Sequence, residues 1–237
     1  KVPVLFISLE MSRQALCSRF TSLLTDIPLQ YLINNDVRGV MFDKLMTGQP
    51  RANATPLIID DQSAITSLQL RSKLRKAIQK SGCKVLFVDY LQKMKTEFIR
   101  GRSKANEVDE IASDLKNIAK EFDIPVIALA QLSREVERRE DKRPMLSDLK
   151  ESGGIEQEAD IVTFLYRPDY YDIKTGKDSE VLPDGYTECI VSKNRNGSLG
   201  TEALIFNKQL TRFEDIKRYE ESEYSIYGQD VENKDLF

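Results

Sequence analysis

The chain has 237 residues, 41% of them hydrophobic, and its 35 basic and 38 acidic side chains give a net charge of −3. This length suits one large domain, and the near-balanced charge neither favours nor excludes a nucleic-acid partner. Histidine is absent, and Cys17, Cys83 and Cys189 lie far apart in sequence. These counts argue against a zinc site, a catalytic triad and a histidine general base.

No apolar run approaches the roughly 18 residues that span a bilayer, and the first residues do not resemble a signal peptide. We therefore expect a cytoplasmic protein without membrane contact. The chain starts at Lys1 rather than at methionine, which suits a processed product or a fragment of a longer protein.

Three apolar runs each end in a polar side chain. They end in Glu10, in Asp89 and in Gln131. Such runs are typical of buried parallel strands, and polar groups at their carboxyl ends predict a nucleotide site at one edge of an α/β sheet. A phosphate-binding Gly-x-x-x-x-Gly-Lys-Ser/Thr loop does not occur in these residues.

Helical signals alternate with the strands. Ser12 is placed to cap a helix that ends before Pro28, and Thr66 begins a capping box for a helix that Gly82 closes. Residues 108–122 have the apolar spacing of an amphipathic helix. This alternation predicts α/β connectivity.

Other segments are less regular. Residues 29–54 have mixed character with short helical pieces, whereas 57–61 form a short β-type run. Residues 95–106 are polar and predict a loop that is long by α/β standards.

The C-terminal part predicts a fourth strand at 161–166 and a hairpin whose strands, 186–192 and 201–206, flank a glycine-rich turn. We expect a largely parallel sheet, finished by antiparallel strands at one edge. The domain would cover residues 1–216, and residues 217–237 would form an acidic, mobile tail.

Three of the polar side chains suit phosphate chemistry. Asp89 can bind Mg²⁺ through water, although a strand-end aspartate is as often a helix cap. Glu10 can polarise an attacking water, a task that needs a carboxylate that is not itself a metal ligand. Gln131 can bond a terminal phosphate, but it can also be a plain hydrogen-bond partner.

Basic residues stand in three further places. Lys193 and Arg195 could project together from the hairpin turn as an arginine finger for a neighbouring subunit, or they could be solvated. Lys150 and the glycines after it could hold a nucleic-acid backbone. The same applies to the polar stretch with Arg100, Arg102 and Lys104, although charged loops are usually solvated.

Together these segments resemble the C-terminal ATPase domain of the DnaB family of replicative DNA helicases. The similarity covers roughly residues 1–215, and the order and spacing of its short segments make chance unlikely as an explanation. The segments that carry it are Phe6-Ile-Ser-Leu-Glu-Met11, Val88-Asp-Tyr-Leu-Gln92, Pro125-Val-Ile-Ala-Leu-Ala-Gln-Leu-Ser-Arg134, Asp141-Lys-Arg-Pro144, Ser147-Asp-Leu-Lys-Glu-Ser-Gly-Gly-Ile-Glu-Gln-Glu-Ala-Asp160 and Lys193-Asn-Arg-Asn-Gly197.

The resemblance implies a RecA-like P-loop NTPase core that hydrolyses ATP or another nucleoside triphosphate with Mg²⁺. It implies that Glu10 is the catalytic glutamate, Asp89 the Mg²⁺-associated aspartate and Gln131 the γ-phosphate sensor. Arg19 is implied to lie near the nucleotide, and Lys193 and Arg195 to be the basic pair supplied to the neighbouring subunit.

The resemblance also implies a homohexameric ring that moves along single-stranded DNA, with a primase and a helicase loader as partners. The loop that holds DNA in the ring channel corresponds to Lys150, Glu151 and Gly153, and the other channel loop to Arg100, Arg102 and Lys104. The position of Lys150 is commonly arginine in the family, so this chain keeps the charge but loses the bidentate fork.

The family's first strand and its P-loop correspond to no residues here. Because that strand is central in a RecA-like sheet, its absence would expose two strand edges and an apolar gap. A chain that truly starts at Lys1 should be poorly stable and bind nucleotide weakly, so we expect Lys1 to be the start of a fragment. Two alternatives stay open: another RecA-like DNA-dependent ATPase, and a truncated DnaB-like ring subunit that cannot hydrolyse ATP.

Overall fold

A computed structural model describes residues 1–96, 103–176 and 181–216. The strands are β1 (Val4–Ser8), β2 (Leu57–Asp60), β3 (Val85–Asp89), β4 (Val126–Ala128), β5 (Ile161–Tyr166), β6 (Tyr186–Asn194), β7 (Gly200–Asn207) and β8 (Arg212–Asp215). The α-helices are α1 (Arg13–Thr25), α2 (Leu29–Ile33), α3 (Val40–Asn53), α4 (Ser67–Ser81), α5 (Lys104–Phe122) and α6 (Gly153–Glu158). Short 3-10 helices are η1 (Leu91–Lys93), η2 (Arg134–Arg138), η3 (Leu146–Ser152) and η4 (Pro168–Tyr171).

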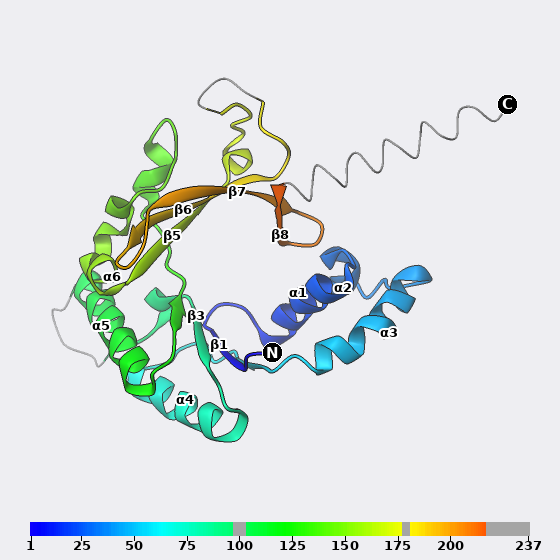
Figure 1. The fold of residues 1–237 in the computed structure, drawn as a ribbon, viewed down its shortest axis with the longest axis horizontal. Coiled ribbons are helices and arrows are strands. Elements are labelled where there is room, and N and C mark those ends of the chain that lie inside the picture. The colour runs from blue at the N-terminus through cyan, green and yellow to red at the C-terminus, as the bar shows by residue number, and fades with distance from the viewer. Residues whose placement is uncertain (97–102, 177–180, 217–237) are drawn as a thin grey trace.

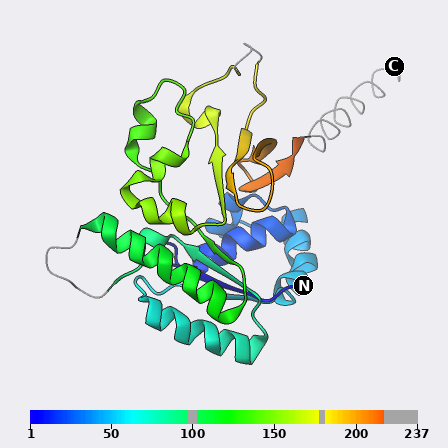
Figure 2. The same cartoon turned by 60° about the vertical axis from the view of Figure 1, so that its left-hand side comes forward.

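The first four strands form a parallel sheet in the order β2-β1-β3-β4. In its centre β1 and β3 run side by side, with Ser8 opposite Asp89. Figures 1 and 2 show α4 and α5 on one side of this sheet and α1 to α3 on the other. The predicted alternation of strands and helices is confirmed.

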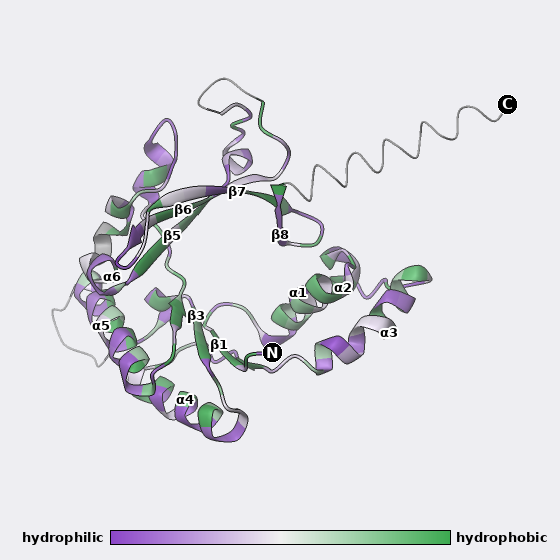
Figure 3. Ribbon diagram, viewed as in Figure 1, coloured by the Kyte–Doolittle hydropathy of each residue, from purple (hydrophilic) through white to green (hydrophobic). Residues whose placement is uncertain are grey.

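Side chains of the central strands alternate between a buried face and a half-buried face. Leu5, Ile7, Leu86 and Val88 are almost fully buried in one cluster with side chains of α4 and α5. On the other face Phe6 stacks on Phe87 at 5.8 Å and meets Phe20 of α1 edge-on at 6.3 Å. In Figure 3 these strands are mainly hydrophobic, as expected for strands covered on both sides, and each ends in a polar residue, Ser8 or Asp89.

Helix caps explain where α1 begins and where α4 begins and ends. The Ser12 side chain accepts a hydrogen bond from the amide of Ala15, and Thr66 and Gln69 form a reciprocal capping box. Gly82 ends α4 in the left-handed conformation, with φ of 62°. The caps predicted at Ser12, Thr66 and Gly82 are therefore present.

The remaining strands form a separate antiparallel sheet in the order β5-β6-β7-β8. The sequence predicted that they would finish the edge of the parallel sheet, but within the described residues β4 and β5 are not hydrogen-bonded to each other. Alternate side chains of β5, including Val162 and Phe164, join the main core, so packing rather than strand pairing connects the two sheets.

Apolar side chains lie exposed where the two sheets end. Ile161 and Leu165 of β5 are 60% and 54% exposed, and Ile127 and Leu129 at β4 are also exposed. These exposed side chains lie at β4 and β5, each of which is an edge strand of its sheet.

Several element boundaries differ from the sequence predictions, and the first is β1, which ends at Ser8 rather than at Glu10. The strand expected to run to Gln131 ends at Ala128. Lys104 is not in a loop but begins α5, because the Ser103 hydroxyl accepts a hydrogen bond from the Asn106 amide and caps the helix. Lys193 lies within β6, so the turn begins after Asn194.

A membrane-spanning helix is not found in the described part of the chain, because none of its helices combines the necessary length and apolarity. The predicted tail, 217–237, lies outside the described residues.

Candidate functional site

Glu10 and Asp89 come together at the carboxyl edge of the parallel sheet. Asp89 is the last residue of β3, and the chain leaves the adjacent strand β1 two residues before Glu10. The Leu9 amide donates a hydrogen bond to the Asp89 carbonyl at 2.7 Å, which ties the two strand ends together. The predicted convergence of these carboxylates at one edge is thus present in the fold.

Ser8 shapes the turn that carries Glu10. Its buried hydroxyl donates to the Met11 carbonyl at 2.8 Å and accepts from the Met11 amide at 3.1 Å. This closes the backbone around Leu9 and Glu10 and leaves the Glu10 side chain exposed. The serine therefore has a structural reason to stand two residues before the glutamate.

The electrostatics around Asp89 link it to Glu10 and to Arg19 of α1. Burial raises the pKa of Asp89, the nearby Glu10 carboxylate raises it further, and the Arg19 guanidinium offsets part of the rise. Arg19 is therefore close enough to act on Asp89. Asp89 is therefore within electrostatic range of both of the other predicted residues, Glu10 and Arg19.

These carboxylates suit a magnesium ion that is shared with a nucleotide. Within the described residues no group of three or more His, Cys, Asp or Glu side chains could hold a metal by itself. Mg²⁺ in nucleotide sites takes only one or two protein carboxylates and completes its shell with phosphates and water. A cation would also counter the like charge that raises the pKa of Asp89, so the residues present fit this ion.

Gln131 is held beside β3 by a residue to which the sequence assigned no role. The Gln92 side chain donates to the Gln131 carbonyl at 2.9 Å and accepts from the Gln131 amide at 3.2 Å. Because Gln92 follows Asp89 by three residues, it fixes the Gln131 backbone relative to that strand end. Its presence in the Asp-Tyr-Leu-Gln segment was the only sequence signal.

Lys193 and Arg195 do not join this cluster but lie against the end of α6. The Lys193 ammonium donates to the Glu156 carbonyl at 2.5 Å, and the Arg195 guanidinium donates to the Gln157 carbonyl at 2.6 Å. Both cations therefore point in the same direction, as their alternation in sequence predicted.

A glycine next to the predicted DNA loop is constrained by packing. The Gly154 amide donates to Asp109 of α5 at 2.7 Å, and a Cβ at Gly154 would lie 2.7 Å from the Asp109 Cα. The predicted residue, Gly153, begins α6, and a Cβ there would meet nothing within 4 Å. Of this pair, Gly154 is thus the residue that packing requires to be glycine.

The other predicted DNA contacts are only partly described. Lys150 and Glu151 fall in η3, but their side chains lie outside what the structure describes, as do Arg100 and Arg102 entirely. Lys104 is described, and its ammonium pairs with Glu107 at 3.0 Å on the first turn of α5.

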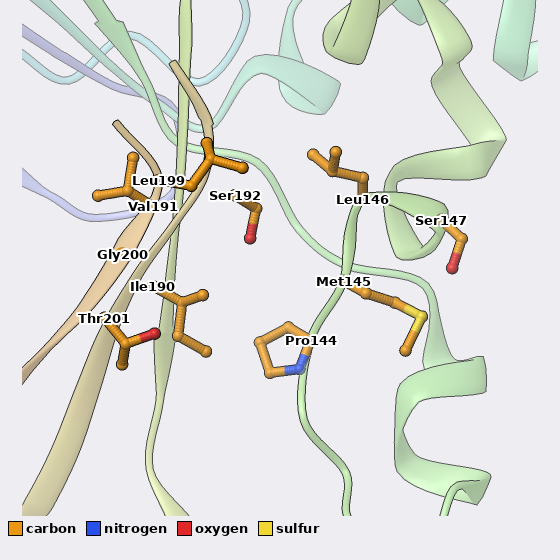
Figure 4. A pocket seen from close by; sticks show the side chains of 10 residues that line it. All are labelled: Pro144, Met145, Leu146, Ser147, Ile190, Val191, Ser192, Leu199, Gly200 and Thr201. Carbon is orange, nitrogen blue, oxygen red and sulfur yellow. The ribbon is translucent and has the colours of Figure 1, made fainter. Parts of the chain in front are cut away.

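A hollow of about 690 Å³ lies elsewhere, between residues 144–147 and the strands β6 and β7 (Figure 4). A second of about 330 Å³ lies near the start of α4. Neither is lined by a carboxylate, and neither contains a predicted catalytic residue. The polar side chains at the strand ends therefore identify the candidate site better than the volume of a hollow does.

Two replicative DNA helicases are similar to this chain. The replicative DNA helicase DnaC of Bacillus subtilis (strain 168) is 42% identical over 218 residues, and the replicative DNA helicase DnaB of Geobacillus stearothermophilus is 43% identical over 218 residues. The aligned part covers 91% of this chain and 46% of each relative. The chain thus spans about half the length of these relatives.

Two solved structures resemble the fold, each with a TM-score of 0.82 and 36% identity over 91% of this chain. One is described as an ATPase domain, of which 75% is covered. The other, of which 51% is covered, is a DnaB-like replicative helicase described together with its interactions with primase. Residues 1–215 match the family described as the DnaB-like helicase C terminal domain. The chain therefore belongs to the family of DnaB-like helicase C-terminal domains.

Proposed function

We propose that this chain is the motor domain of a replicative DNA helicase, in which ATP hydrolysis between the subunits of a hexameric ring drives movement along single-stranded DNA and unwinding of the duplex. The observation that carries the proposal is the meeting of Glu10 and Asp89 at adjacent strand ends, with Arg19 of α1 within electrostatic range of Asp89. The replicative helicases among the relatives favour this function over a recombinase-like ATPase or a ring subunit without hydrolysis.

The two carboxylates would have different tasks. Asp89 would hold Mg²⁺ through water, and Mg²⁺ bound with ATP neutralises charge on the phosphates. Glu10, more exposed and on its own turn, would orient the attacking water and accept its proton. Arg19 would face the phosphates from α1.

Gln131 would sense the terminal phosphate from the third strand end. Gln92 supports this role because its two hydrogen bonds hold the Gln131 backbone in place. The Gln131 side chain is therefore not needed to fix this segment. A movement of Gln131 on gaining or losing a phosphate contact would then be transmitted to both β3 and β4.

The basic pair would complete the site of the neighbouring subunit. The hairpin that carries Lys193 and Arg195 belongs to the antiparallel sheet, whereas Glu10 and Asp89 lie at the ends of parallel strands. Both cations contact α6, and this separation suits groups that act on another subunit's nucleotide. A guanidinium there stabilises the charge that develops as the phosphate is transferred.

DNA would be held by two segments next to α6 and α5. Lys150, Glu151 and Gly153 form the segment that enters α6, and Arg100, Arg102 and Lys104 belong to the segment that enters α5. The ring, a primase partner, a helicase loader and a cytoplasmic location are part of the same proposal.

The test is ATP hydrolysis by the complete native protein, with and without a single-stranded oligonucleotide. Wild type should be stimulated by DNA. Glu10→Gln should lose turnover by about 10²- to 10⁴-fold, the usual contribution of a general base, and keep nucleotide binding. Glu202→Gln on β7 is the matched control and should remain active. Undiminished turnover in Glu10→Gln would remove Glu10 from the catalytic role.

A further inference from the structure

The short helix α6 is contacted at both ends by other parts of the chain. At its start, Asp109 of α5 accepts the Gly154 amide at 2.7 Å. At its end, Lys193 and Arg195 of the β6 hairpin donate to its last carbonyl groups. Cations are favourable at a helix C-terminus, where carbonyl groups lack partners within the helix. α6 therefore connects the candidate DNA segment to the candidate basic pair.

Asp160 adds a charged contact to the end of α6. Its Oδ1 atom accepts from Nη1 of Arg195 at 3.1 Å, and its carbonyl accepts from the Arg195 amide at 2.9 Å. The Arg195 guanidinium thus has two acceptors in its own subunit, Asp160 and the Gln157 carbonyl.

A second cation shares the same carboxylate. Lys116 of α5 pairs with Oδ2 of Asp160 at 2.5 Å. The Lys116 hydrogen bond is the largest influence that lowers the pKa of Asp160, followed by the charges of Lys116 and Arg195. Asp160 is therefore a carboxylate held between α5 and the hairpin, and it stays ionised at neutral pH.

We propose that Asp160 is a positioning residue that retains Arg195 on α6 of its own subunit and releases it to the neighbouring subunit's nucleotide when DNA shifts α6. The inference rests on the proposed function, because it needs Arg195 to act on a neighbour. It adds a residue, Asp160, and a physical connection from the DNA segment to the basic pair.

The retaining contact is weak enough to exchange. The side chains of Arg195 and Asp160 are 46% and 52% exposed, so water screens their attraction. A triphosphate offers several negative oxygens and a better match to the guanidinium fork. Arg195 can therefore leave Asp160 for a phosphate, at the expense of the contacts that hold the end of α6.

The first test is Asp160→Asn in the complete native protein, assayed for ATP hydrolysis with and without oligo-dT. The variant keeps the shape of the side chain and removes its charge. DNA-free hydrolysis should rise about two- to fivefold, the range that an exposed ion pair supports, while the DNA-saturated rate stays near wild type. The stimulation ratio should fall by the same factor.

The second test uses the other partner of Asp160 and predicts the opposite sign. In Lys116→Gln the Asp160 carboxylate faces Arg195 without competition, so DNA-free hydrolysis should fall by about twofold. A general disturbance of folding would lower the rate in both variants. Opposite changes in the two variants support the proposal, and changes in the same direction overturn it.

Controls separate this inference from the proposed function. Asp184→Asn removes the pair with Lys208 on a distant loop and should leave the stimulation ratio unchanged. Asp160→Glu keeps the charge and should keep a ratio near wild type. An active Arg195→Ala variant would contradict the proposed function, whereas an inactive one combined with an unchanged ratio in Asp160→Asn would overturn the inference alone.

Discussion

The two charged regions of this molecule differ in whether their charged side chains already have partners of opposite charge or hydrogen-bond acceptors. At the strand ends of the parallel sheet, Glu10 and Asp89 repel each other and burial opposes the ionisation of Asp89, with Arg19 as a partial offset. At the β6 hairpin, Lys193 and Arg195 already have acceptors on α6 and Asp160.

This difference suggests how each region would work. The strand ends are short of positive charge, so they are prepared for a cation that arrives with a nucleotide. The hairpin has its charges satisfied, so it can act elsewhere only by exchanging partners. The strand ends would bind a cation together with a nucleotide, and the hairpin cations would exchange their present acceptors for another partner.

The largest expected effect belongs to the second region. Arg195→Ala should lower ATP hydrolysis by about 10³- to 10⁵-fold, the contribution of an arginine finger, because charge that develops on the phosphate would be left without a guanidinium. Steady-state hydrolysis measures this, and the control is Arg38→Ala, because Arg38 is an exposed arginine that pairs with Asp36 two positions away. A loss of less than tenfold would assign Arg195 to α6 alone.

In the first region, Asp89→Asn should reduce hydrolysis by about 100-fold or more, because a metal contributes several kcal/mol to phosphate chemistry. The same variant should be more stable than wild type at neutral pH. The raised pKa of Asp89 means that its ionised form is disfavoured in the folded state, and asparagine removes this cost.

The stability difference between Asp89→Asn and wild type should depend on pH. The free-energy cost of ionising Asp89 in the folded state is fully present above the raised pKa of the folded protein. It disappears as pH falls below 3.8, the ordinary pKa of an aspartate. Urea denaturation of both proteins should therefore show an advantage for Asp89→Asn at pH 7 that shrinks on acidification. An Asp89→Asn protein less stable than wild type at pH 7 would contradict the description of this region as short of positive charge.

The smallest effect concerns an ion pair between α1 and the antiparallel sheet. Arg212 of β8 pairs with Asp26, the C-cap of α1, at 2.5 Å. Asp26 has φ of 54°, which asparagine also tolerates, so Asp26→Asn removes mainly the charge. We expect a loss of about 0.2–1 kcal/mol in the free energy of unfolding, smaller in 1 M salt. An equal loss at low and high salt would point to backbone strain instead.

Local chemistry explains which parts of the fold were predictable. Apolar runs, caps such as Ser12 and Thr66, and carboxylates at strand ends are encoded within a few neighbouring residues, and the structure has them where they were predicted. The start of α5 was missed because its first turn is polar, although Ser103 is a recognisable cap.

Long-range contacts explain what was missed. The sequence identified Lys193 and Arg195, but not that they lie on α6, because the carbonyl groups of Glu156 and Gln157 that they contact are 37 and 38 positions away. The pairing of Gln92 with Gln131 spans 39 positions. The separation into two sheets also depends on packing that no local pattern specifies.

The central claim is that one subunit supplies Glu10 and Asp89 and its neighbour supplies Arg195. Mixing two inactive variants of the complete protein, Glu10→Gln and Arg195→Ala, tests it most directly. If sites are shared across a heterologous ring interface, about one quarter of the interfaces in an equal mixture join an intact Glu10 to an intact Arg195. ATP hydrolysis should then recover well above that of either variant. A mixture that exchanges subunits and stays as inactive as its components would contradict the claim.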